Sequence, residues 1–190
     1  MPTAEGRALY RWGREAARSG PLLEIGSYCG KSALYLGAAA REAGGLLFTI
    51  DHHRGSEEQQ PGEQYHDPRF VESRLGRIDT LPWLRRTLAR AGLEDVVVPV
   101  VGESSLVGRH WQTPLALVFI DGGHAEATVE ADYRCWGPKL IKGGLLAIHD
   151  VFPDPADGGQ APFHVYVRAM ESGHFLEVGA EGSLRLLRRR

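Results

Sequence analysis

The sequence predicts a doubly wound α/β fold, in which helices cover both faces of a mostly parallel sheet of seven strands. Two observations carry this prediction. Short, continuous apolar runs alternate with helical segments along most of the chain, as in parallel strands that are buried on both faces. Near the C-terminus, two apolar runs are joined by a short Gly-containing link, which predicts an antiparallel strand pair at one edge of the sheet.

In the first half of the chain, Gly, Pro or Asp marks the end of most expected helices and strands. A helix over Thr3–Arg18 carries its apolar residues on one stripe and stops before a Gly-Pro pair. The apolar runs Leu22–Ile25 and Leu46–Ile50 are expected to be strands, closed by Gly and Asp. The Ala- and Leu-rich segment Lys31–Ala43 between them is expected to be helical. The polar stretch His52–Pro68 contains Gly and Pro and is expected to be a loop.

The second half of the chain continues the alternation. Two helical segments are expected after that loop, the second of them over Thr80–Ala91. Apolar runs predict three further parallel strands, and one-sided apolar patterns predict two further helices. The strands are Val96–Val101, Leu115–Ile120 and Leu145–Ile148, the helices are Glu126–Trp136 and Phe163–Ser172, and the terminal pair is Phe175–Val178 with Leu184–Leu187.

Length and composition indicate one globular domain over residues 1–190, with an N-terminal helix within 1–20. The 22 basic and 24 acidic residues give a net charge of -2, which favours neither nucleic acid nor an anionic membrane as a partner. No apolar run approaches the ~20 residues of a membrane span, and the N-terminus lacks the apolar core of a secretory signal. The only cysteines, Cys29 and Cys135, have no framework spacing, so a reduced, cytoplasmic protein is expected. The excess of Arg over Lys is typical of a GC-rich bacterial genome.

Polar residues follow the expected parallel strands at the points where those strands end. In open α/β sheets, ligands bind outside the carboxyl ends of the strands. Here those ends carry Gly26, Asp51, the run 102–104, Asp121 and the pair His149-Asp150. The sequence therefore predicts a binding site at this edge of the sheet.

The turn after the first strand is compatible with several ligands. A phosphate-binding P-loop is disfavoured because one residue is missing between Gly26 and the Gly-Lys-Ser that begins at Gly30. A dinucleotide fingerprint is disfavoured because Tyr28 takes the place of its middle Gly. Two interpretations remain open. The turn can be of the kind that binds S-adenosylmethionine, with Asp51 placed to hold both ribose hydroxyls, or it can be a tight turn that binds nothing.

Two stretches of the chain resemble one group of enzymes. The stretch Leu23–Ala33 looks very similar to the cofactor turn of catechol O-methyltransferase, including its Tyr-Cys-Gly. The stretch Val118–Asp150 resembles the bacterial methyltransferase 24 group and the metal-dependent macrolide-sugar O-methyltransferases, through an Ile-Asp-Gly-Gly-His turn, a helix, a Lys-Gly-Gly and a strand ending in His-Asp. The resemblance spans most of residues 20–152. It implies a class I methyltransferase with a Rossmann-like fold that uses S-adenosylmethionine.

Carried over by position, the resemblance also implies which residues contact the cofactor. Asp51 would hold the ribose, and Asp121 is a further expected contact. The residues expected along the methionine part are Glu24, Gly26, Tyr28 and Ser32, and those expected near the adenine are His52 and Ser104.

Two carboxylates and a histidine predict metal-assisted chemistry. Asp121 and Asp150 end strands that are expected to be neighbours, and adjacent strands lie ~4.8 Å apart. Both carboxylates can therefore reach one divalent cation, for which Mg²⁺ is the first expectation. His124 is the expected general base because its unperturbed pKa is ~6.5. In the resembled families, the matching positions serve as metal ligand and base. The alternative is that Asp121 only caps the following helix.

The remaining histidines leave two questions open. His149 is a further expected metal ligand, and an imidazole ligand would favour Mn²⁺, Fe²⁺ or Zn²⁺. Alternatively, the alternation of side chains along a strand turns His149 to the opposite face, where it is a packed or hydrogen-bonded residue. His52, His53 and His66 could instead form a first-row metal site with His124.

The expected function is therefore metal-assisted methylation of a hydroxyl on a small molecule, such as a sugar, a phenol or a natural-product intermediate. Loops 53–68 and 152–162 are expected substrate lids because they are long, polar and interrupted by Gly and Pro. The alternatives are a non-catalytic nucleoside-binding module and an NAD-dependent oxidoreductase. A homo-oligomer is left open, because the N-terminal helix of one copy could cover the pocket of another.

Overall fold

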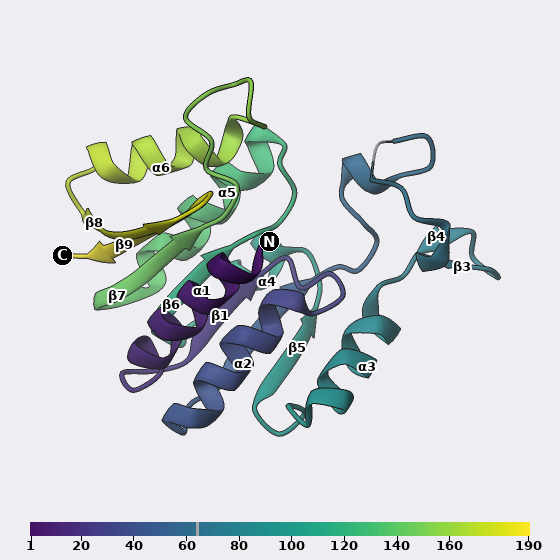
Figure 1. Ribbon diagram of the computed structural model, residues 1–190, viewed down its shortest axis with the longest axis horizontal. Coiled ribbons are helices and arrows are strands. Elements are labelled where there is room, and N and C mark those ends of the chain that lie inside the picture. The colour runs from purple at the N-terminus through teal and green to yellow at the C-terminus, as the bar shows by residue number, and fades with distance from the viewer. Residues whose placement is uncertain (64) are drawn as a thin grey trace.

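The computed structural model describes residues 1–63 and 65–190; Gln64, which belongs to the expected lid 53–68, lies outside the described residues. Within them, seven strands form one sheet in the order β5-β2-β1-β6-β7-β9-β8 (Figure 1). The first five strands in this order are parallel, and β9 runs antiparallel to both of its neighbours. The predicted fold class is therefore confirmed. The strands are β1 Leu22–Ile25, β2 Leu47–Asp51, β5 Val97–Val101, β6 Leu115–Ile120, β7 Leu140–Ile148, β8 Phe175–Glu181 and β9 Leu184–Arg189.

Helices cover both faces of this sheet (Figure 1). Three pack on one face and three on the other, and strand residues alternate between the two cores: Leu22 and Leu47 belong to one, Leu23 and Ile50 to the other. The covered faces leave the carboxyl ends of the strands as the side on which a site can be built. The first face carries α1 Thr3–Ala16, α2 Lys31–Ala43 and α3 Leu81–Ala91, and the second α4 Ser104–Arg109, α5 Glu126–Trp136 and α6 Ala161–Glu171.

The expectation of two helical segments between residue 68 and Ala91 is wrong. In this described part of the chain, α3 is the one α-helix. Short elements take the place of the first one: the 3-10 turn Pro68–Phe70, β3 Val71–Glu72 and β4 Arg77–Ile78. The carboxylate of Glu72 accepts hydrogen bonds from the N–H groups of Arg74 and Leu75 and so closes the β3–β4 turn. Strands of two residues leave no alternation in the sequence, which is why the pattern did not reveal them. Figure 1 shows this hairpin standing away from the sheet.

Several other boundaries shift by a few residues, and two differences are larger. The short helix α4 has no counterpart among the expected elements; it is held at its start by Glu103, whose carboxylate accepts hydrogen bonds from the N–H groups of Ser105 and Leu106. Strand β7 begins at Leu140, earlier than expected, because its pairing with β6 continues past a register shift to Leu115. In the part of the chain that the structure describes, no helix combines the length and the apolar character that crossing a membrane requires.

Candidate functional site

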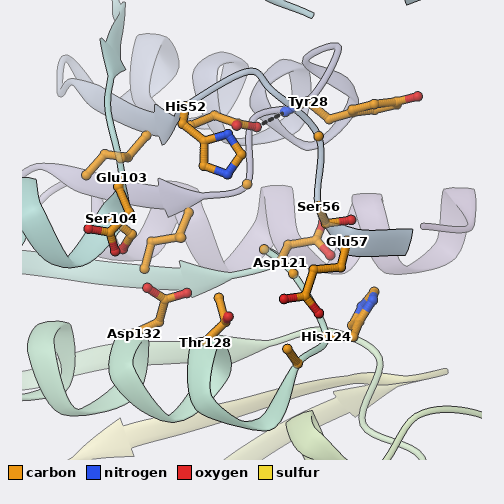
Figure 2. A pocket seen from close by; sticks show the side chains of 18 of the residues that line it. Tyr28, His52, Ser56, Glu57, Glu103, Ser104, Asp121, His124, Thr128 and Asp132 are labelled. Carbon is orange, nitrogen blue, oxygen red and sulfur yellow. Dashed lines mark hydrogen bonds between the residues drawn. The ribbon is translucent and has the colours of Figure 1, made fainter. Parts of the chain in front are cut away.

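A cavity of about 580 Å³ lies at the carboxyl ends of β1, β2 and β6 and extends to the start of α4 (Figure 2). Loop residues 55–59 form one wall, and α5 forms the opposite wall. Its volume is within the range of ordinary small-molecule sites. The residues of the predicted site that line it are Gly26, Tyr28, Asp51, His52, Ser104, Asp121 and His124. The cavity therefore lies where the sheet topology predicts a ligand.

The turn after β1 is shaped by the close approach of two strand ends. Gly26 has φ +95°, and a Cβ atom there would overlap the backbone carbonyl oxygen of Asp121, so only glycine fits. Asp51, at the end of β2, accepts hydrogen bonds from the N–H of Tyr28 (2.8 Å) and from the N–H of His53 (2.7 Å). This carboxylate therefore joins two loops that border the cavity. Each of its oxygens keeps a lone pair for a ligand hydroxyl.

His52 and Ser104 lie at the same end of the cavity (Figure 2). The Nδ1 atom of His52 accepts a hydrogen bond from the N–H of Arg54 (3.0 Å). The hydroxyl oxygen of Ser104 accepts one from Nε1 of Trp136 (2.8 Å). These bonds fix both side chains at the cavity wall, where the sequence resemblance places the adenine.

Asp132 of α5 also lines the cavity, although it is not among the predicted site residues. Its carboxylate points into the cavity toward Ser104 (Figure 2), and burial raises its pKa to about 6. It lies on the same buried helix face as Val129 and Trp136. A charged residue within an apolar stripe is thus the signal that could have revealed it.

Two of the predicted cofactor residues, Glu24 and Ser32, are buried and are not among the residues that line the cavity. The carboxylate of Glu24 accepts a hydrogen bond from the hydroxyl of Thr49, while its other oxygen, Oε1, has no hydrogen-bond partner among the described residues. Burial raises the pKa of Glu24 to about 7. Direct contact of Glu24 or Ser32 with a cofactor stays a prediction.

Charged side chains gather at the ends of β6 and β7. The two strands pair in parallel as far as Ile120 and Ile148, so the residues that follow them lie side by side. The possible ligand atoms of Asp121, His149 and Asp150 lie within 4.8 Å of one another. Asp150 has φ +54°, and this left-handed turn lets two consecutive residues face the same point. His149 is thus both close to the two carboxylates and buried with a hydrogen-bond partner, and its role as a metal ligand stays a prediction.

The imidazole of His149 is only 5% exposed, and its Nδ1 faces two carboxylates. Nδ1 lies 3.0 Å from Oδ1 of Asp121 and 3.1 Å from Oδ2 of Asp150, but it is not directed for a hydrogen bond with either. Burial opposes a charge on this ring, but the two carboxylates outweigh it and raise its pKa to about 10.

A small void of about 10 Å³ borders Asp121, His124 and His149 and is close to the size of one water molecule. Neighbouring ligands of an octahedral ion, with bonds of ~2.1 Å at right angles, lie ~3 Å apart. The separations around Nδ1 of His149 match that spacing. At neutral pH the two carboxylates hold a proton on Nδ1, so this nitrogen, Asp121 and Asp150 fit a divalent cation that takes the place of that proton.

His124 bridges two carboxylates from different parts of the chain. Its Nε2 lies 3.0 Å from Oδ2 of Asp150, and its Nδ1 lies 3.2 Å from Oε2 of Glu58 in the loop. The hydrogen bond with Asp150, supported by that with Glu58, outweighs burial and raises the pKa of His124 to about 9. Burial would raise the pKa of Asp150, but His124 and His149 hold it well below its usual value. In this arrangement, His124 keeps its proton at neutral pH.

The expected lids and the loop histidines are placed as follows. Residues 55–59 of the first lid line the cavity, whereas none of residues 152–162 does. The Nδ1 atom of His53 shares a hydrogen bond with the hydroxyl of Thr80 (2.8 Å), and that of His66 lies 3.0 Å from the carbonyl oxygen of Gln59. Within residues 1–63 and 65–190, neither of these histidines nor His52 belongs to a cluster that could hold a metal ion.

Residues 23–151 match the model of the methyltransferase 24 family, which is described as a methyltransferase domain. The matched range includes the turn after β1 and the ends of β6 and β7. Both ends of the cavity therefore belong to the part of the chain that the family shares.

Several solved structures with the same fold are O-methyltransferases. TomG from Streptomyces achromogenes, which is involved in tomaymycin synthesis and was solved with SAM, is 18% identical with a TM-score of 0.66, over 100% of this chain and 81% of TomG. An O-methyltransferase from Bacillus cereus, in complex with SAH, is 16% identical with a TM-score of 0.69, over 100% of this chain and 82% of the Bacillus cereus protein. The O-methyltransferase NovP is 15% identical with a TM-score of 0.70, over 98% of this chain and 79% of NovP. At these identities the likeness shows a shared fold.

Proposed function

Because the chain belongs to the methyltransferase 24 family, we propose that it transfers the methyl group of S-adenosylmethionine to a hydroxyl of a small molecule, with the help of a divalent cation. The similar structures solved with SAM and SAH support this choice of cofactor. The observation that carries the proposal is the cavity, which has Asp51 at one end and Asp121 and His124 at the other. One cavity thus combines groups that suit a nucleoside with groups that suit an acceptor hydroxyl.

At the nucleoside end, Asp51 is the proposed acceptor for the ribose hydroxyls, because a carboxylate after the second strand is the group that such hydroxyls need. Its two backbone hydrogen bonds keep the carboxylate in place before a ligand arrives. Gly26 and Tyr28 border the methionine part, with Glu24 and Ser32 behind them. His52 and Ser104 border the adenine.

At the acceptor end, Asp121, His149 and Asp150 are the proposed cation ligands, and this set of oxygens and one nitrogen suits Mg²⁺ or Mn²⁺. When bound, a divalent cation supplies positive charge that acidifies a nearby hydroxyl and offsets the carboxylates that keep the proton on His124.

His124 is the proposed general base for the acceptor. Both ring nitrogens face carboxylates, Nδ1 that of Glu58 and Nε2 that of Asp150, and Nε2 is the proposed site for the hydroxyl proton because a cation held by Asp150 would weaken that contact. Such assistance is typically worth ~10²–10⁴ in rate. Much of the remaining acceleration comes from holding the acceptor oxygen in line with the methyl group.

The loops complete the proposed acceptor site. Residues 55–59 form the wall opposite α5, so their closure over a bound acceptor would exclude water from the methyl group. Loop 152–162 remains a proposed, more distant lid.

A non-catalytic nucleoside-binding module is the second candidate. It would use the Asp51 end of the cavity but has no need for Asp121, His124 and Asp150 together. An NAD-dependent oxidoreductase is disfavoured by Tyr28, whose side chain stands where a dinucleotide site needs glycine.

Binding and turnover experiments test the proposal in sequence. Calorimetry with S-adenosylhomocysteine, NAD and ATP should show that S-adenosylhomocysteine binds most tightly; preferential binding of NAD or ATP would overturn the cofactor assignment. Methyl transfer to a panel of phenols, sugars and other hydroxyl compounds should stop with EDTA and return with Mg²⁺ or Mn²⁺. Full activity after EDTA treatment would remove the metal from the mechanism. Binding of S-adenosylhomocysteine without transfer or metal binding would favour the binding module.

A further inference from the structure

Glu5, in the first turn of α1, is a carboxylate with only 2% of its surface exposed. A charged side chain this deeply buried needs partners. Its Oε1 accepts hydrogen bonds from the N–H (2.7 Å) and the hydroxyl (2.9 Å) of Ser183, and its Oε2 lies 2.8 Å from Nε2 of His149. With Oε1 accepting both donors of Ser183, Oε2 is the oxygen left to accept a hydrogen bond from Nε2 of His149.

Three separate parts of the chain meet at this carboxylate: α1, the end of β7 and the β8–β9 turn. Gly182 in that turn has φ +54°, and a Cβ atom there would overlap Oε1 of Glu5, so the turn is built around the carboxylate. The carbonyl of Ser183 accepts a hydrogen bond from the N–H of Val151 (3.0 Å), which anchors the turn next to the proposed ligand Asp150. Glu5 lies outside residues 23–151, the range that matches the family model.

We infer that Glu5 is a positioning residue for the divalent cation: it holds a proton on Nε2 of His149 and so presents the lone pair of Nδ1 between Asp121 and Asp150. This inference rests on the metal site proposed above. An imidazole binds a cation through a nitrogen with a free lone pair, and the other nitrogen then carries the proton. Because Glu5 offers only acceptor atoms, Nε2 is the nitrogen that carries it.

Other packing roles do not require this geometry. A buried carboxylate needs hydrogen-bond donors in any role, but the two donors of Ser183 both go to one oxygen and leave the other for the imidazole alone. Carboxylates that orient ligating histidines in this way commonly contribute ~10–100-fold to metal affinity. The ring of His149 itself packs edge-to-face against Phe119, which fixes its plane but not which nitrogen carries the proton.

The substitution Glu5→Gln tests the inference with little change in shape. The amide oxygen is still needed by Ser183, so the NH₂ group faces Nε2 of His149 and favours a proton on Nδ1 instead. Mn²⁺ affinity, measured by calorimetry, should fall ~10–100-fold, while affinity for S-adenosylhomocysteine should stay within about twofold. Glu15→Gln is the matched control: it is the same change on the same helix, in an exposed ion pair with Arg188, and should alter neither affinity.

A double-mutant cycle separates positioning from general support of the fold. If Glu5 acts through His149, Glu5→Gln should cause no further loss of Mn²⁺ affinity in a His149→Ala background. Equal losses in both backgrounds would overturn the inference, as would Mn²⁺ binding by Glu5→Gln that matches the wild type. If the wild type binds neither Mn²⁺ nor Mg²⁺, the proposed metal site itself fails, and the role of Glu5 fails with it.

A measurement on the wild type keeps the test open if Glu5→Gln does not fold. In the Mg²⁺-loaded protein, long-range ¹H–¹⁵N NMR should show a proton on Nε2 of His149 and no proton on Nδ1. The opposite tautomer would overturn the inference even though the metal is bound.

Discussion

Beside β1 and β2 the backbone defines the shape of the cavity, whereas at the ends of β6 and β7 charged side chains gather around His149, which is not among the residues that line the cavity. Gly26 acts by lacking a Cβ atom, and Asp51 acts by accepting two backbone N–H groups. In contrast, the imidazole of His149 is surrounded by three carboxylates. A site shaped by the backbone should keep its geometry when a distant charge is changed. A site held by opposing charges should lose its geometry when one of those charges is removed. The two ends should therefore respond separately to mutation.

The largest effect is expected from His124→Gln, which tests whether the charged end acts on turnover. Glutamine keeps a polar group between Glu58 and Asp150 but cannot accept the hydroxyl proton. With an acceptor identified in the panel, kcat should fall ~10²–10⁴-fold, while the affinities for S-adenosylhomocysteine and Mn²⁺ should change little. An unchanged kcat would show that His124 is not the base.

The next effect is expected from Asp150→Gly, which removes a proposed ligand without straining the left-handed backbone at this position. Mn²⁺ affinity should fall by about 100-fold or more, since even the loss of a group behind a ligand costs ~10–100-fold. Calorimetry with S-adenosylhomocysteine is the control and should show an affinity close to that of the wild type. A parallel loss of both affinities would mean that the two ends of the cavity are coupled.

A pH-dependent effect on stability is expected at the backbone-shaped end, from Glu24. Burial raises the pKa of Glu24 to about 7 in the folded protein, above its ordinary value of 4.5. The stability that its proton provides is thus fully present below pH 4.5 and is lost as the pH rises to 7. Glu24→Gln, which cannot titrate, should therefore exceed the wild type in free energy of unfolding at pH 8 by about 1–3 kcal/mol, and by less at pH 5. Urea unfolding of the metal-free wild type and Glu24→Gln at pH 5 and pH 8 measures these free energies. A difference between the two proteins that does not vary with pH would show that titration of Glu24 is not its cause.

An effect of similar size in free energy, on cofactor binding, is expected from Asp51→Ala, which removes the proposed ribose contact. Hydrogen bonds to a charged group contribute about 1.5–3 kcal/mol, so affinity for S-adenosylhomocysteine should fall about 10–100-fold. Asp95→Ala is the control, because Asp95 is an exposed Asp in an ion pair with Arg41 away from the cavity. Mn²⁺ affinity should not change in either variant, and a loss in Asp51→Ala alone would contradict the separation of the two ends.

The sequence predicted those parts of the site that follow from sheet geometry. Asp51, Asp121 and Asp150 were found because parallel strands end at one edge, and the family resemblance agreed with that reasoning. Glu58 and Glu5 were not found, because their partners lie 66 and 144 residues away in the chain and no local pattern connects them. The same holds for the fold: the long apolar strands were predicted, while the β3–β4 hairpin depends on hydrogen bonds within a loop.

The left-handed backbone at Asp150 also limits which sequences this position can explore. Asn and Gly share with Asp a tolerance of positive φ, whereas branched and bulky residues do not. In a saturation-mutagenesis library scored for cellular abundance, position 150 should therefore accept few substitutions, and position 121, whose backbone is not in that region, should accept more. Scored for methyl transfer, both positions should become equally intolerant. The difference between the two scores at each position would separate the selection that folding imposes from the selection that chemistry imposes.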